Sequence, residues 1–127
     1  MYLLTLATII EMNADNPPTD NHSTFLLKEC IATLGVLASD PANREALASN
    51  TVSHVLAIAK SNMGHAKLLK TSLGCLINIA STQSLARDPN FYQILYTVLD
   101  QYCESKPMID YILRLILNSI QSNQISL

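Results

Sequence analysis

Two twelve-residue segments decide the fold, KECIATLGVLAS at positions 28–39 and KTSLGCLINIAS at positions 70–81. They lie 42 residues apart and share four identical positions, Lys28/Lys70, Leu34/Leu76, Ala38/Ala80 and Ser39/Ser81. A third copy follows after 40 residues, where Leu113, Ile116, Asn118 and Ile120 take the places of Leu73, Leu76, Asn78 and Ala80. Self-similarity at this period is typical of chains built from stacked helical repeats.

Apolar residues recur at helical spacing along most of the chain, and no stretch alternates as a strand would. We expect helices at about 2–12, 24–39, 41–48, 52–61, 65–81, 89–103 and 107–122, and a loop at 13–22. Asp40 and Asp88 each precede a proline, the arrangement of an N-cap before a first helical position. Asn50 and Gly64 are expected to adopt left-handed turns, and Thr51 to cap the following helix. The fold class is therefore all-α.

The composition excludes several classes of protein. A net charge of −2, with 14% charged residues, disfavours nucleic-acid binding, because such proteins carry a basic patch. No apolar run approaches the length of a membrane span, and residues 1–10 lack the basic start of a signal peptide. Three widely spaced cysteines, Cys30, Cys75 and Cys103, fit small buried residues better than a disulfide or zinc framework. We expect an intracellular, most simply cytoplasmic, protein without metal or cofactor.

The segment Cys75-Leu-Ile-Asn-Ile-Ala80 resembles the end of the long third helix in armadillo repeats, which reads close to Ala-Leu-x-Asn-Leu-Ala. Asn43-Arg-Glu-Ala-Leu47 is similar to the start of the family's short first helix. Asn50-Thr-Val-Ser-His-Val-Leu56 fits the frame of Gly-x-Ile-Pro-x-Leu-Val, with Asn and Ser in place of Gly and Pro. The resemblance implies a right-handed α-solenoid of three-helix repeats, with HEAT repeats as the open alternative.

In that frame residues 1–127 form one domain of about two and a half repeats. Residues 1–39 supply a partial repeat that includes the loop, 40–82 a complete repeat, and 83–127 a divergent one. Because solenoid repeats bury their faces only against neighbours, we expect a fragment of a longer chain. Apolar side chains of the first helix, Leu3, Leu6 and Ile10, are then expected to be exposed.

The resemblance also implies a binding groove along the third helices, where the asparagine of each repeat holds the backbone of an extended partner peptide. Asn78 and Asn118 occupy that place, and Val36 stands there in the first repeat. A side chain amide both donates and accepts hydrogen bonds, although the same residue could instead bond a carbonyl within the solenoid. The further groove candidates are Glu29, Ala32, Thr71, Gly74 and Arg114. Importin-α-like members carry tryptophan at the places of Ala32, Gly74 and Arg114, so their recognition of nuclear localisation signals is not expected here.

These observations favour a non-catalytic scaffold or adaptor that binds a peptide or helix. The alternative is homotypic self-association in a larger assembly of cytoskeletal, ciliary or centriolar type. An enzyme is a remote third reading, because the chain lacks a phosphate loop and the common hydrolase motifs. Phe91, Leu95 and Val98 follow core spacing. For Tyr92 and Tyr96 we expect core or partly buried helix packing, with joint display at an interface as the alternative.

Overall fold

The computed structural model describes residues 2–16, 18–46, 49–80, 85 and 88–121. Within these ranges all regular secondary structure is helical, as the apolar spacing predicts, and there is no strand. The helices are α1 (Tyr2–Asp15), α2 (Asn21–Leu37), α3 (Pro41–Ala46), α4 (Ser49–Ser61), α5 (Ala66–Ile79), α6 (Pro89–Gln101) and α7 (Lys106–Gln121). Each predicted helix is found, and the ends differ from the prediction by three residues or fewer.

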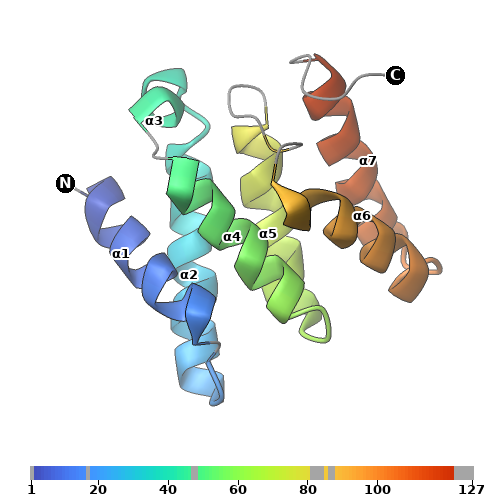
Figure 1. The fold of residues 1–127 in the computed structure, drawn as a ribbon, viewed down its shortest axis with the longest axis horizontal. Helices are drawn as coiled ribbons and strands as arrows, with labels where there is room; N and C mark the ends of the chain where they lie inside the picture. Colours follow the sequence, from blue (N-terminus) through green and yellow to red (C-terminus); the bar gives the residue numbers. More distant parts are fainter. Residues whose placement is uncertain (1, 17, 47–48, 81–84, 86–87, 122–127) are drawn as a thin grey trace.

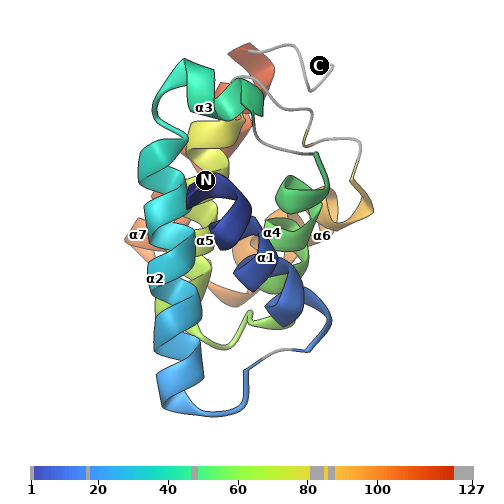
Figure 2. The ribbon, with the colours of Figure 1, turned by 90° about the vertical axis from the view of Figure 1, so that its left-hand side faces the viewer.

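Six of the helices form two layers, with α1, α4 and α6 in the first layer and α2, α5 and α7 in the second (Figures 1 and 2). Each helix packs against its neighbours within its own layer and against its partner in the other. We call α1–α2, α4–α5 and α6–α7 the first, second and third pair. The short α3 lies beside the end of α2 in both views, and the Asn43 side chain amide donates to the Leu37 carbonyl oxygen at 2.9 Å.

The core runs through all three pairs, and the central helix α5 is buried on two sides. One side matches the buried positions of α2, and the other matches those of α7. The first α5 set comprises Leu69, Leu73, Leu76 and Ala80, which correspond to buried Leu27, Ile31, Leu34 and Ala38. The second comprises Leu68, Ser72, Cys75 and Ile79, which correspond to buried Met108, Ile112, Leu115 and Ser119. Because α2 and α7 each have a second-layer neighbour on one side only, each of them buries only the set that faces α5.

Side chain caps fix several helix starts where the sequence predicts them. The Asp40 and Asp88 carboxylates accept from the backbone N–H groups of Ala42 and Asn90, both at 2.9 Å. The predicted loop at 13–22 is shorter, because α1 continues to Asp15 and Asp20 already caps α2. The Asp20 carboxylate accepts from the Ser23 N–H at 2.6 Å, and this bond lowers the pKa of Asp20.

The prediction of left-handed turns at Asn50 and Gly64 is wrong. Asn50 and Thr51 both lie inside α4, which begins at Ser49, another residue type that favours helix starts. Gly64 does lie in the turn after α4, but its φ is outside the left-handed region. The residue at that turn need not be a glycine, since an added Cβ would meet nothing within 4 Å.

The expected exposure of the first helix is also wrong where it is described. Ile10 is fully buried and Leu6 is half-buried against the core, because α1 packs on both α2 and α4. The side chain of Leu3 lies outside the described part. The first helix is thus an integral part of the core.

Candidate functional site

The eight groove candidates all lie on the three helices of the second layer. They form what we call the α2–α5–α7 face: Glu29, Ala32 and Val36 on α2, Thr71, Gly74 and Asn78 on α5, and Arg114 and Asn118 on α7. The candidates on α2 and Arg114 are exposed, whereas those on α5 and Asn118 are half-buried. Residues from three segments about 40 positions apart are thereby brought onto successive helices.

Two asparagines make the same contact between successive helices. The Asn78 Nδ2 donates to the Gly35 carbonyl oxygen on α2 at 2.8 Å, and the Asn118 Nδ2 donates to the Ile77 carbonyl oxygen on α5 at 2.9 Å. Gly35 and Ile77 occupy equivalent places, one residue before Val36 and Asn78. The carbonyl-bonding role weighed in the sequence is therefore present, and the peptide-binding role of these amides stays a prediction.

The charged candidates at the two ends of the face each pair with a neighbour on their own helix. The Glu29 carboxylate lies 3.3 Å from the Lys28 Nζ, and the Arg114 Nε lies 3.0 Å from the Asp110 carboxylate. All four side chains are at least partly solvated, and such surface pairs contribute only about 0–1 kcal/mol each. Among the candidates, Glu29 on α2 is the acidic one and Arg114 on α7 is the basic one, and each has a neighbour of opposite charge on its own helix.

The sequence missed one member of this face. Tyr111 on α7 stands at the place of Glu29 and Thr71, and its ring edge approaches Gly74, where an added Cβ would lie 3.7 Å from Cε1. It is half-buried and packed against the core. The 40-residue spacing from Thr71 was the available signal, because it puts Tyr111 in the same row.

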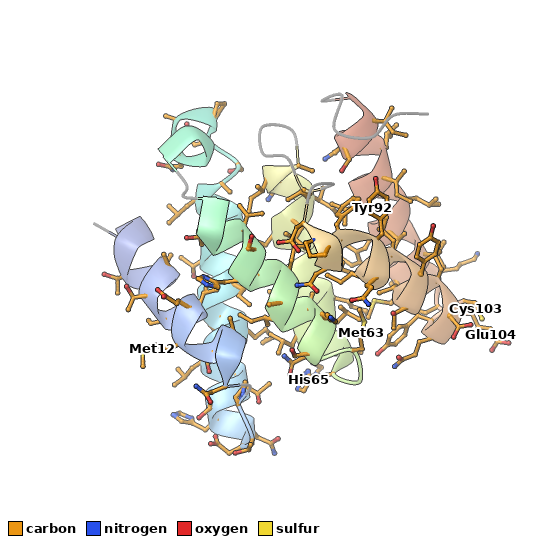
Figure 3. All side chains as sticks on the ribbon, in the orientation of Figure 1. Met12, Met63, His65, Tyr92, Cys103 and Glu104 are labelled. Carbon is orange, nitrogen blue, oxygen red and sulfur yellow. The ribbon has the colours of Figure 1, made fainter. Side chains whose placement is uncertain are left out.

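The cysteines differ from one another in exposure. Cys75 is buried as expected, and burial raises its pKa to about 12. Cys30 is half-buried, and burial together with the charge of Glu29 raises its pKa as well. Cys103 is exposed, so its expected burial is wrong: it lies two residues after Gln101, the last residue of α6, in the turn to α7 (Figure 3). An open hollow of about 400 Å³ beside it is lined by Cys103, Glu104, Lys106, Ile109, Asp110 and Leu113.

The exposed aromatic residues contradict the preferred sequence interpretation. Phe91, Leu95 and Val98 are buried as expected, but Tyr92 is 41% and Tyr96 is 71% exposed on α6. Joint display at a surface, the alternative weighed in the sequence, describes these two residues. His65, the residue before α5, has a structural role as the N-cap of that helix: its Nδ1 accepts from the Leu68 N–H at 3.2 Å.

In the described part of the chain, no cluster of three or more histidine, cysteine or acidic side chains is arranged to hold a metal ion. None of the described helices has the length and apolarity needed to cross a membrane. No protein-family model matches the chain, and neither a curated protein nor a solved structure matches it.

Proposed function

We propose that the chain is an armadillo-like α-solenoid module that binds an extended peptide or a partner helix along the α2–α5–α7 face, and that it acts by binding and not by catalysis. The observation that carries the proposal is the repeated placement of matching residues on three successive helices. From the second to the third pair, both helices advance by 40 residues, and the bonds of Asn78 and Asn118 recur with them.

The spacing of the helices suits an extended ligand. Packed helices lie about 8–10 Å apart, and an extended chain rises about 3.3 Å per residue. A peptide that crosses α2, α5 and α7 therefore meets a new helix about every third residue. A segment of roughly seven residues or more spans the face.

The chemistry of the face favours a ligand of mixed polarity. Six of the eight candidates are uncharged, among them Asn78 on α5 and Asn118 on α7, and the two charged candidates, Glu29 on α2 and Arg114 on α7, are of opposite sign. Amides recognise a peptide backbone in any sequence, since every peptide unit offers both a donor and an acceptor. The position of Glu29 on α2 favours a basic residue at that end of the ligand, and Arg114 on α7 favours an acidic residue at the other.

A library of random peptides of about twelve residues, selected on the immobilised chain, tests the proposal. Selected peptides should bind one per chain, and Ala32→Arg should abolish binding because it places a long charged side chain across the face. Asn78→Ala should weaken binding and destabilise the fold by about 1 kcal/mol through loss of its bond to Gly35. Thr97→Glu, at an exposed position of α6, is the control and should leave binding unchanged. Selected peptides that ignore Ala32→Arg would refute this assignment.

A further inference from the structure

Among the described side chains, large apolar ones are exposed only at the two ends of the stack. The nine exposed ones among the described side chains are Met12, Phe25, Leu26, Val36, Tyr92, Tyr96, Leu99, Leu113 and Leu117. All of them lie on α1, α2, α6 or α7, and none lies on α4 or α5. Figure 3 shows Met12 at one edge of the molecule, and Cys103 and Glu104 at the opposite edge.

The exposed residues of α6 and α7 stand at positions that are buried one pair earlier. Tyr92, Tyr96 and Leu99 correspond to Val52, Leu56 and Ala59, which α4 buries fully or almost fully. Leu113 is 58% exposed, whereas its counterpart Leu73 is 0% exposed. The other α7 members are half-buried Ile109, Ile116 and Ile120, whose counterparts Leu69, Leu76 and Ala80 are buried. We call these seven α6 and α7 residues the C-terminal face, which has the form of a surface that packs a further helix pair.

The outer side of α2 shows the complementary half of the pattern. Leu26, Cys30, Thr33 and Leu37 correspond to Leu68, Ser72, Cys75 and Ile79, the buried set of α5 that faces α2. The position of Cys75 against α2 fixes this side, because an added Cβ on Gly35 would lie 3.3 Å from the Cys75 Cα. We call these four α2 residues the N-terminal face. Leu26 is 50% exposed there, although Leu68 is fully buried.

We propose that the N-terminal face of a second copy of this chain stacks on the C-terminal face, so that helix pairs continue from one copy to the next. Both halves of the contact exist in one chain, since α5 packs on α2 with one set and faces α7 with the other. The contact would repeat internal packing with equivalent residues. This proposal concerns the ends of the stack. It shares Glu29, Val36 and Arg114 with the α2–α5–α7 face but does not require that this face binds a peptide.

Charge complementarity supports a second copy over an unrelated partner. Inside the chain, Gly74 on α5 lies against Tyr111 on α7. Arg114 on α7 is equivalent to Gly74, and Glu29 on α2 is equivalent to Tyr111. At a junction between two copies, Arg114 of the first copy would therefore lie against Glu29 of the second. Stacking in this register therefore puts an acidic side chain opposite a basic one.

The asparagine row points to the same register. Positions 36, 78 and 118 are equivalent and form this row. Asn78 donates to the carbonyl oxygen of Gly35 and Asn118 to that of Ile77, in each case the residue just before the row position of the preceding helix. At the junction the residue facing α7 from the second copy would be Val36, which has no donor and is 71% exposed. The residue it would meet is Leu117, which is 54% exposed. An apolar contact there replaces the hydrogen bond found between the internal helices.

Sedimentation velocity of residues 1–127 over a range of concentrations tests the stacking. A contact between two different faces leaves a free face at each end, so the average mass should rise beyond that of a dimer. Leu113→Glu disables the C-terminal face and Leu26→Glu disables the N-terminal face. Each should weaken association by about ten- to a hundredfold, because burial of a leucine is lost and a charge faces an apolar surface. Both substitutions are at exposed positions, and circular dichroism should show intact helices.

The two variants together separate stacking from other modes of association. An equimolar mixture should form dimers and nothing larger, because one working face remains on each partner and both outer faces are disabled. Ala66→Glu, at an exposed position of the second pair, is the matched control and should associate like the unsubstituted chain. Glu29→Arg and Arg114→Glu should each weaken association by up to about fivefold, and the double variant should recover it. A chain that stays monomeric, Leu26→Glu that associates alone as tightly as the unsubstituted chain, or a mixture that associates no better than either variant alone would each overturn the proposal.

Discussion

Replacing Gly35 by alanine should destabilise the protein, although alanine is the better helix former. Gly35 lies inside α2, where this exchange alone would stabilise the helix by about 0.5–1 kcal/mol. The new Cβ would stand 3.3 Å from the Cys75 Cα, closer than the roughly 3.5–4.0 Å at which carbon atoms attract. The obstructing atom belongs to the backbone of α5, so relief requires the two helices to move apart. Overpacking of this kind costs about 1–3 kcal/mol.

Gly74 is the matched control, because it lies inside α5, a helix of the same layer as α2. A Cβ there would be 3.7 Å from the Tyr111 ring, an ordinary contact with a side chain. Gly74→Ala should therefore stabilise the protein by about 0.5–1 kcal/mol. The helix-propensity gain is common to both variants, so their difference of about 1–3 kcal/mol isolates the close approach of α2 and α5.

Urea unfolding followed by circular dichroism measures this difference, with equal slopes of free energy against urea as a check that only stability has changed. Cys75→Ala should not rescue Gly35→Ala, since the nearest atom is the Cα, which alanine also has. If Gly35→Ala proves as stable as Gly74→Ala, the tight contact between α2 and α5 is wrong, and the register that places Asn78 beside Gly35 falls with it.

Three further predictions concern single sites. Gly64→Ala should raise the free energy of unfolding by about 0.4–1 kcal/mol in the same urea assay, because its φ is ordinary and the space around it is open. Burial raises the pKa of Cys75 from 9.0 to about 12, so above pH 9 the unfolded chain releases a proton that the folded chain keeps. Stability should fall by up to about 1.4 kcal/mol per pH unit between those values, and Cys75→Ala should remove that part of the slope. A thiol reagent added to the folded chain should modify exposed Cys103 first and Cys75 only after unfolding, as peptide mapping would show; early loss of the Cys75 thiol would contradict its burial.

Local sequence signals predicted the helices well because each of them acts within one or two turns. Apolar spacing placed all seven helices, and Asp40 and Asp88 bond the backbone two residues ahead, within their own helix starts. Asn50 failed as a boundary because a serine one residue earlier offers an equally good start, and local chemistry does not choose between them. The candidate residues reached one face because the repeat spacing carries equivalent positions from helix to helix.

Exposure at the ends of the stack could not be predicted in this way. Tyr96 and Leu56 occupy equivalent positions on equivalent helices, yet one is 71% and the other 1% exposed. Apolar spacing states which side of a helix is suited to burial, but it does not state whether another helix stands there. The expected burial of Tyr92 and Tyr96 was wrong for this reason.

The two proposals make separate demands on the same arrangement of helix pairs. Binding along the α2–α5–α7 face uses a side of the second layer on which polar residues recur, and only Glu29, Val36 and Arg114 among its members would also lie at a junction between copies. Stacking uses the sides that every internal pair covers, and those sides are mostly apolar at both ends. Copies joined end to end would place their α2–α5–α7 faces in one continuous line. The row of asparagines would be interrupted at each junction, because Val36 stands at that position on α2. A peptide longer than one chain's face would then bind the stacked form more tightly than the Leu113→Glu monomer, whereas a short peptide would bind both equally.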